Sequence, residues 1–248
     1  MSFLRALLFN VYLHLWTICM ALVSIFSLVF PARIIVRFAQ LWSAGVTFGA
    51  AAILGVRSEI RGRRYLEDPR VVVAAKHQSA WETIRLSNLV DRPSTVLKRE
   101  LAELPVYGYY FKRAGMIPVD REKGAQAIRD LLRQARQRLD EGRTIIIYPE
   151  GTRIPPGERG RYFPGIYALY HELGVPVVPV ALNSGLYWRR GSFTKIPGRI
   201  VVEALPPIPP GLDRKAFLAA LEEKLEGASD RLVAEGRADL RRRGYEPA

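Results

Sequence analysis

The hydrophobic positions of the first 56 residues form two long apolar stretches, and no acidic residue occurs in this region. The first stretch, Ala6 to Phe30, is uncharged over a length that lets a helix cross the roughly 30 Å hydrocarbon core of a bilayer. The second, Phe38 to Val56, is also uncharged and is rich in glycine and alanine. Pro31, Arg33 and Arg37 separate the two stretches. The pattern predicts a helical hairpin whose cationic elbow can lie at lipid phosphates.

A cleaved signal peptide is the alternative interpretation of this N-terminal region. The apolar part of a signal peptide usually has ~7 to 15 residues and is followed by a small-residue cleavage site. The run here is longer and leads into Phe30-Pro-Ala-Arg33, which favours a membrane anchor over residues 1–56. Whether the hairpin spans the bilayer or enters one leaflet stays open. Tyr12, Trp16 and Trp42 suit the headgroup boundary, which amphipathic rings prefer.

After Val56 the pattern changes to short β-branched runs that alternate with helical periodicity, which predicts an α/β fold. The expected strands are Val71 to Ala75, Thr144 to Tyr148, Val175 to Ala181 and Arg199 to Glu203. Apolar residues recur at helical spacing between Ile128 and Leu139 and again between Ala216 and Leu232. We therefore expect one α/β domain over residues 57–248, preceded by the hairpin of residues 1–56.

The charge of the chain indicates an anionic partner. The sequence has 37 Lys and Arg against 24 Asp and Glu, a formal net charge of +13, which suits a lipid surface, a phosphorylated substrate or nucleic acid. No basic patch is interleaved with aromatic residues in the manner of a nucleic-acid site, so we expect no nucleic-acid partner. The single cysteine, Cys19, excludes an intramolecular disulfide and a CxxC zinc cluster. We predict no metal site and a cytosolic domain.

The candidate chemistry lies where an apolar strand leads directly into a histidine, in Val71-Val-Val-Ala-Ala-Lys-His77-Gln-Ser-Ala-Trp-Glu82. Strand ends expose reactive groups in α/β folds, and an imidazole there can act as a general base near neutral pH. Glu82 can reach back to His77, fix its tautomer and stabilise the imidazolium. Ser79 and Glu82 also match a capping box, in which the serine caps a helix and the glutamate accepts the serine amide. These two residues alone do not decide between catalysis and capping.

The motif resembles the hallmark of the glycerolipid acyltransferase family, which includes 1-acylglycerol-3-phosphate acyltransferases: histidine, four residues, then aspartate. His77 matches the histidine, and Glu82 occupies the aspartate position with one extra methylene. The resemblance implies that His77 and Glu82 are the catalytic pair. It also implies a mixed β-sheet flanked by helices, behind membrane-anchoring helices.

Further blocks similar to those of this family follow in the expected order. Gly115-Met-Ile-Pro-Val-Asp-Arg121 is similar to a block that ends in an arginine, whose planar donor fork suits a phosphate. Tyr148-Pro-Glu-Gly-Thr-Arg153 resembles the block Phe-Pro-Glu-Gly-Thr-Arg with one aromatic change. Lys98 matches a family lysine placed near the phosphate, and Val175-Pro-Val-Val-Pro-Val resembles an apolar strand that we expect to pack in the core.

The hexapeptide offers four candidate substrate contacts with different chemistry. Gly151 lets backbone amides approach an oxyanion, and Thr152 and Arg153 supply a hydroxyl and a fixed positive charge. Glu150 is expected to hold that cation or a glycerol hydroxyl.

The resemblance covers roughly Arg57 to Glu203 and implies an enzyme of phospholipid biosynthesis. The implied reaction moves an acyl group from acyl-CoA or acyl carrier protein to the sn-2 hydroxyl of 1-acylglycerol-3-phosphate, giving phosphatidic acid. His77 would remove the hydroxyl proton, and Lys98, Arg121 and Arg153 would position the phosphate. No cofactor is expected. The expected partners are membrane lipids, the two substrates and acyl carrier protein as one candidate donor, at the cytosolic side of the inner membrane.

Two alternatives stay open. The acceptor can be another lysolipid, such as a lyso-ornithine lipid, whose carboxylate would use the same cations. A non-catalytic basic membrane-binding protein belongs to a different class, and its signature is salt-dependent binding without acyl transfer.

Overall fold

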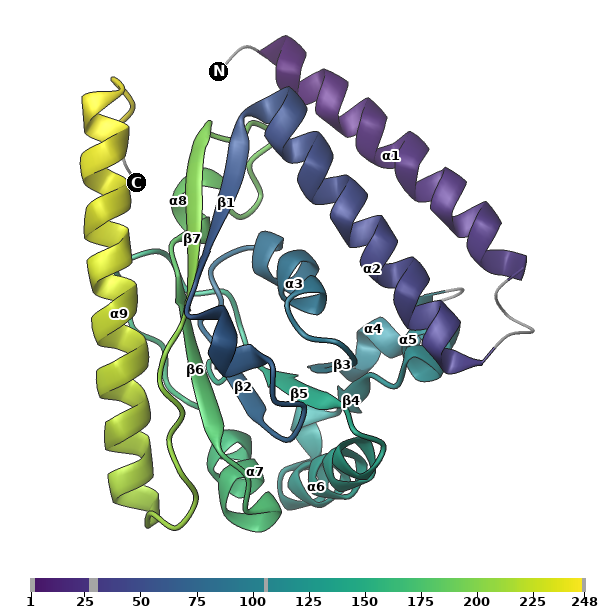
Figure 1. Cartoon of the computed structure of the whole chain (residues 1–248), viewed down its shortest axis with the longest axis vertical. Helices are drawn as coiled ribbons and strands as arrows, with labels where there is room; N and C mark the ends of the chain where they lie inside the picture. The colour runs from purple at the N-terminus through teal and green to yellow at the C-terminus, as the bar shows by residue number, and fades with distance from the viewer. Residues whose placement is uncertain (1–2, 27–30, 105–106, 247–248) are drawn as a thin grey trace.

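A computed structural model describes residues 3–26, 31–104 and 107–246, and its centre is a seven-stranded mixed sheet (Figure 1). The strands are β1 (Val56–Arg61), β2 (Val72–Ala75), β3 (Pro93–Lys98), β4 (Ile117–Val119), β5 (Thr144–Ile147), β6 (Val177–Leu182) and β7 (Gly198–Ala204). Their order across the sheet is β1-β7-β6-β2-β5-β3-β4. All neighbours are parallel except β6 and β7, which are antiparallel. The five strands from β6 to β4 therefore point the same way.

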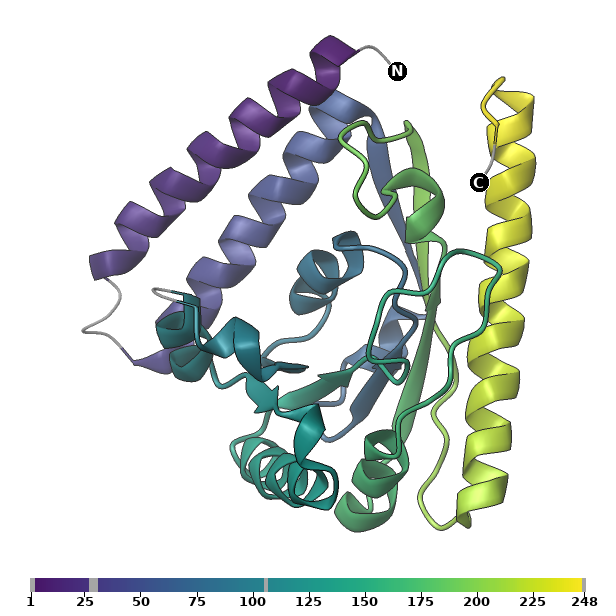
Figure 2. The ribbon, with the colours of Figure 1, turned by 180° about the vertical axis from the view of Figure 1, so that it is seen from behind.

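Helices cover both faces of this sheet, because its strands are apolar on both sides. The helices after β2 are α3 (Trp81–Arg85), α4 (Arg99–Ala102), α5 (Tyr107–Ala114), α6 (Ala125–Asp140), α7 (Gly165–Leu173), α8 (Ser184–Tyr187) and α9 (Arg214–Arg242). Along β2, Val72 and Ala74 face one core with α6, α7 and α9, whereas Val73 and Ala75 face the other with α3, α8 and the N-terminal helices. In Figures 1 and 2 the sheet lies between α9 and those N-terminal helices.

The predicted elements of the α/β domain are present, with shifted ends. The four expected strands are β2, β5, β6 and β7, each within two residues of its predicted bounds. The stripe from Ile128 to Leu139 lies on α6, which buries Leu131, Ala135 and Leu139 at four-residue spacing. The helix expected to end at Leu232 continues as α9 to Arg242. As expected, the strand of the block that begins at Val175 packs in the core, because every residue of β6 is buried.

The N-terminal hairpin consists of α1 (Phe3–Phe26) and α2 (Ala32–Gly49), and a π-helical turn (Ala50–Leu54) extends α2. Phe3–Ser24 and Ala32–Leu54 are long and apolar enough to cross a membrane, by length and composition. The predicted elbow residues Pro31, Arg33 and Arg37 are described: Pro31 precedes α2, and both arginines lie on α2. Residues 27–30, at the end of the first predicted stretch, lie outside the described part of the chain.

Three aromatic side chains hold the two hairpin helices together. Tyr12 donates to the Gly45 carbonyl at 2.9 Å, and the Trp16 indole donates to the Trp42 carbonyl at 3.0 Å. The Trp42 indole in turn donates to the Thr17 hydroxyl at 3.0 Å. Any side chain at Gly45 would collide with the Trp16 ring. The polar atoms of these rings bond within the hairpin, and their position at a headgroup boundary stays a prediction.

The hairpin lies along the α/β domain instead of standing apart from it. At one end the Phe9 ring meets the Trp188 ring edge-on at 5.6 Å, and at the other Ile35 packs against Ala114. Between them the Ser43 hydroxyl donates to the Ile84 carbonyl at 2.7 Å. Residue 56, the predicted domain boundary, is the first residue of β1, but the hairpin shares the core of the domain that follows.

Candidate active site

The sequence blocks meet at one edge of the sheet. β2, β5, β3 and β4 are adjacent and parallel, so their carboxyl ends lie side by side, where open α/β sheets bind ligands. His77 follows β2, and Tyr148 follows β5. Lys98 ends β3, and Arg121 lies just beyond β4. Strand order thus assembles residues that are far apart in the chain.

His77 and Glu82 form the predicted pair. The Nδ1 of His77 lies 2.9 Å from Oε1 of Glu82, which is fully buried. A carboxylate can only accept, so Nδ1 carries the hydrogen and Nε2 is left to accept a proton from the pocket side. The same Oε1 accepts the backbone N–H groups of Gln78 and Ser79, each at 2.6 Å. The carboxylate therefore fixes both the histidine ring and the loop that carries it.

The second oxygen of Glu82 is held by two hydroxyls. Ser79 donates to Oε2 at 2.9 Å and Ser184 at 2.6 Å. Burial by itself raises the pKa of Glu82, but the hydrogen bond and charge of His77, with the serine donors, bring this pKa below its ordinary value. Ser184 lies just beyond β6, and no local signal in the sequence pointed to it. Glu82 is an ionised partner for His77.

Capping and pairing coexist in this structure. Glu82 accepts the Ser79 N–H as the capping box predicts, and the Ser79 hydroxyl accepts the N–H of Trp81, the first residue of α3. The carboxylate has enough lone pairs to serve the helix and His77 together. The contact between His77 and Glu82 and the bond from the Ser79 N–H to Glu82 are therefore both present, while the Ser79 hydroxyl accepts from Trp81 and not from the Glu82 N–H that a capping box uses.

The Tyr148 ring stacks on His77, with ring centroids 4.4 Å apart and planes 28° apart. Burial holds the pKa of Tyr148 well above its ordinary value, so the ring stays neutral beside the histidine. The sequence identified Tyr148 only as an aromatic substitution at the start of the hexapeptide.

Glu150 takes a different position from the predicted substrate contact. It is buried, and its Oε1 binds Lys76 Nζ at 2.6 Å while its Oε2 accepts the His77 N–H at 3.1 Å. The Ile154 N–H donates to the His77 carbonyl at 2.8 Å, so the two motif loops are bonded on both sides of the histidine. Glu150 is absent from the pocket wall that the described residues form. Its geometry is that of a residue that positions His77.

Lys76 is the centre of a buried ionic network that the sequence did not reveal. Besides Glu150, its Nζ binds both oxygens of Glu226 on α9, at 2.9 and 2.7 Å. Tyr162 donates its hydroxyl to Glu226 Oε1 at 2.7 Å. Lys76 is 1% exposed and Glu226 2%, so each charge depends on the others for compensation. The network ties α9 to the residue that precedes His77.

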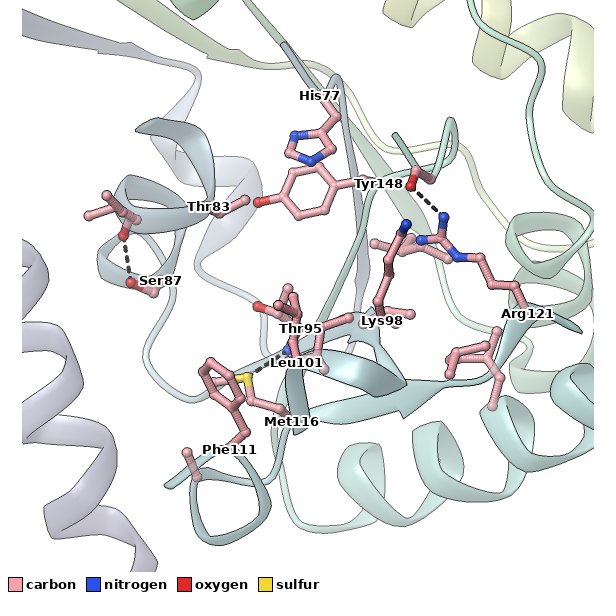
Figure 3. Close-up of a pocket in the computed structure, with 18 of the residues that line it drawn as sticks. His77, Thr83, Ser87, Thr95, Lys98, Leu101, Phe111, Met116, Arg121 and Tyr148 are labelled. Atoms are coloured by element: carbon pink, nitrogen blue, oxygen red, sulfur yellow. Dashed lines mark hydrogen bonds between the residues drawn. The ribbon is translucent and has the colours of Figure 1, made fainter. Parts of the chain in front are cut away.

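A cavity of about 1210 Å³, here called the catalytic pocket, opens beside His77. Its wall is mainly apolar and comes from the hairpin and the α/β domain together, including Met20, Phe38, Leu101 and Phe111. Figure 3 shows His77 and Tyr148 at one side of this space, with apolar side chains such as Phe111 and Met116 at the other. An apolar chain can fill the pocket while its polar end reaches His77.

The predicted cations reach the same pocket. Its wall includes Lys98, Arg121, Gly151, Thr152 and Arg153. Figure 3 shows the side chains of Lys98 and Arg121 extending into it below Tyr148. A phosphate bound there would lie near the histidine and at the end of the apolar space.

Gly151 has a role in placing Arg121. Its φ of 64° is left-handed, and a Cβ would stand 2.6 Å from Arg121 Nη1. Arg121 donates to the Gly151 carbonyl and lies over the Phe163 ring, 5.4 Å from its centroid. The Gly151 N–H donates to the Tyr148 carbonyl at 2.9 Å, so this amide is engaged within its own turn. Among the described residues no cluster of three or more His, Cys, Asp or Glu can hold a metal ion.

Comparisons with known proteins agree with this arrangement. A family model described as Acyltransferase matches residues 57–183. The chain is 34% identical over 208 residues to a 1-acyl-sn-glycerol-3-phosphate acyltransferase of Pseudomonas aeruginosa, covering 84% of this chain and 81% of the relative. It is 29% identical to 1-acyl-sn-glycerol-3-phosphate acyltransferase alpha of Mus musculus, covering 64% of this chain and 57% of the relative.

A solved structure has the same fold. The crystal structure of the 1-acyl-sn-glycerophosphate (LPA) acyltransferase PlsC from Thermotoga maritima matches 94% of this chain and 98% of its own, with a TM-score of 0.75 and 21% identity. This confirms the prediction of a mixed sheet flanked by helices behind two apolar N-terminal helices.

Proposed function

We propose that this chain, which belongs to the acyltransferase family, moves a fatty acyl group from a thioester to the sn-2 hydroxyl of 1-acylglycerol-3-phosphate, giving phosphatidic acid. The observation that carries the proposal is the position of His77, paired with a buried carboxylate where an apolar pocket meets the predicted cations Lys98, Arg121 and Arg153. A lysophospholipid has this combination of acyl chain, free hydroxyl and phosphate. The names of the relatives support the same acceptor.

The proposed acyl transfer follows from the pairing of His77 with Glu82. His77 Nε2 takes the proton as the sn-2 oxygen attacks the thioester carbonyl carbon, and the carbon–sulfur bond breaks as the tetrahedral intermediate collapses. The imidazolium then returns the proton to the departing thiolate. Glu82 offsets the imidazolium charge, and no acyl-enzyme forms. This sequence of steps uses no cofactor, and we expect turnover to be unchanged by a chelator.

By binding the substrate phosphate, the cations bring the reacting hydroxyl close to His77. Lys98, Arg121 and Arg153 hold the phosphate and so place the sn-2 hydroxyl at Nε2. Thr152 lines the pocket beside them and supplies a hydroxyl for the glycerol phosphate. The donor is acyl-CoA or acyl carrier protein, and the assay below compares both.

The enzyme is proposed to work at a membrane, on the cytosolic side of the inner membrane. Large apolar side chains on α1, including Leu4, Leu8 and Leu15, are 55–71% exposed, which leaves an apolar face for lipid. Because both ends of the hairpin contact the α/β domain, we propose that it enters one leaflet. Protease accessibility in right-side-out and inverted membrane vesicles tests on which side of the membrane the α/β domain lies.

The test measures transfer of a labelled acyl group from each donor to 1-acylglycerol-3-phosphate. His77→Ala is expected to lose turnover, and His171→Ala, which changes an exposed histidine on α7, is the matched control. Full activity of His77→Ala would exclude it as the base. A lyso-ornithine lipid as acceptor tests the alternative headgroup. Salt-dependent vesicle binding with no transfer from either donor would favour the non-catalytic membrane protein.

A further inference from the structure

A second cavity lies at the elbow of the hairpin, outside the catalytic pocket. It measures about 480 Å³ and is lined by the start of α2, the end of α5 and the segments that precede β3, β4 and β5. Six of its ten lining residues are basic: Arg33, Arg92, Lys112, Arg113, Arg138 and Arg143. One is acidic, Glu141, so the lining carries a formal excess of five positive charges. We call this cavity the elbow pocket.

Glu141, the acidic residue of this lining, already pairs with basic residues of the elbow pocket. Its two carboxylate oxygens bind Arg138 Nη1 at 2.6 Å and Arg143 Nε at 2.8 Å, and its backbone carbonyl accepts from Arg92. Burial lowers the pKa of Arg143, and the charges of Arg92 and Arg138 lower it further, against the opposing effect of Glu141. The positive charge of the elbow pocket is therefore in excess of its internal compensation. A bound anion would relieve this repulsion.

The elbow pocket and the catalytic pocket are separate cavities on two sides of α5. Tyr110, Phe111 and Ala114 line the catalytic pocket, whereas Lys112 and Arg113 line the elbow pocket. No described residue lines both. The two sides also differ in character, because one is mainly apolar and the other is basic.

The location of the elbow pocket points to lipid as the source of the anion. Pro31, Ala32 and Arg33 line it, at the start of the second of two helices that are long and apolar enough for a membrane. When the exposed apolar face of α1 enters lipid, the start of α2 lies near the headgroups, where basic side chains meet phosphates. The sequence indicated only a basic elbow, and the structure adds five cations from the α/β domain.

We propose that the elbow pocket binds the phosphate of an anionic membrane phospholipid and thereby holds the hairpin at the membrane surface. This site goes beyond the acyl-transfer site, and it does not depend on the identity of the acceptor.

The test compares the full-length protein with a double variant in which two cations are replaced by neutral glutamine. Arg33→Gln with Lys112→Gln removes two exposed cations of the elbow pocket and leaves the Glu141 contacts in place. Arg214→Gln with Lys215→Gln is the matched control, since it removes one arginine and one lysine from the exposed start of α9. Binding is measured by sedimentation with vesicles of phosphatidylcholine, with and without phosphatidylglycerol.

We expect wild type and control to prefer the anionic vesicles, and the elbow variant to bind them roughly ten- to thirtyfold more weakly, as expected for two basic residues at a charged surface. Its acyl transfer to detergent-dispersed substrate and its unfolding midpoint should match wild type. Equal weakening of both variants would overturn the site in favour of diffuse charge. Equal binding of wild type to both vesicles, with stabilisation by inorganic phosphate, would overturn the lipid in favour of a free phosphate.

Discussion

Replacing Glu82 with glutamine separates the charge of this residue from its hydrogen bonds. The donors on Oε1 are His77 and the adjacent N–H groups of Gln78 and Ser79. A glutamine carbonyl has two lone pairs, one for His77 and one that the two neighbouring amides can share. The glutamine amide can donate to the hydroxyls of Ser79 and Ser184, which accept as well as donate. The loop and the histidine tautomer should therefore persist in Glu82→Gln. The negative charge is what the substitution removes.

Loss of the Glu82 charge should destabilise the transition state, in which His77 becomes an imidazolium. At the 2.9 Å hydrogen-bonded contact the two charge centres are about 4 Å apart, and an effective dielectric constant of about 20 gives roughly 4 kcal/mol for the ion pair. Since about 1.4 kcal/mol is a factor of ten in rate, this predicts a loss of turnover of roughly a hundred- to a thousandfold. The unfolding free energy should fall by only about 1 kcal/mol, because the hydrogen bonds are kept.

The assay is the initial rate of acyl transfer at saturating substrates, together with thermal unfolding of the same samples. Glu172→Gln is the matched control, because Glu172 also contacts a histidine, His171 at 3.1 Å, but on the exposed surface of α7. Turnover of Glu82→Gln within threefold of wild type would refute the electrostatic role. A loss of activity in proportion to unfolding would assign Glu82 to capping alone.

Three further predictions concern the surroundings of the pair. Lys76→Met leaves Glu150 and Glu226 as buried carboxylates without their cation, so chemical denaturation should show a loss of about 3–5 kcal/mol, and a change below 1 kcal/mol would contradict the network. Tyr148→Phe keeps the stacked ring and should retain turnover, whereas Tyr148→Leu should lower it severalfold, since such ring pairs contribute about 0.5–1.5 kcal/mol. Equal turnover of these two variants would exclude a contribution of ring stacking to the reaction. The folded-state pKa of Glu82 is lowered, so its ionisation stabilises the fold fully above the ordinary value of 4.5 and this stability is lost as the pH falls through the lowered value. Acid unfolding should therefore depend less on pH in Glu82→Gln, and an unchanged profile would contradict the shift.

The sequence predicted the strands whose residues are continuously apolar. It missed β1 and β3, whose residues include charged side chains or a proline. β2 and β5 are buried at every residue and read as runs of valine, isoleucine and alanine. β1 alternates poorly and exposes charged residues at the edge of the sheet, and β3 starts with a proline and ends in a lysine. Their strand conformation depends on pairing with β7 and β5, which no local pattern reports.

The contacts of the candidate site likewise divide into those that a local pattern predicts and those that only the fold brings together. The pairing of His77 with Glu82 was predictable because five residues of chain can close only a short turn, and the motif blocks are contiguous. Glu150 was predicted as a substrate contact from its neighbours Gly151 and Thr152. Its actual partners are Lys76 and the His77 amide, 74 and 73 residues away, and they meet only because β2 and β5 are adjacent.

By itself, the sequence determined the local features of this protein: two membrane-length apolar helices, the main strands, and the residues that we propose as a base, its carboxylate partner and phosphate-binding cations. These depend on periodicity and on short contiguous blocks. The tertiary structure decided which polar groups are buried together, such as Glu82 with Ser184 and Lys76 with Glu226, which is 150 residues away. It also decided that the hairpin forms a wall of the catalytic pocket. Burial and charge compensation arise from strand order and helix packing, so they belong to the folded chain and not to any segment of it.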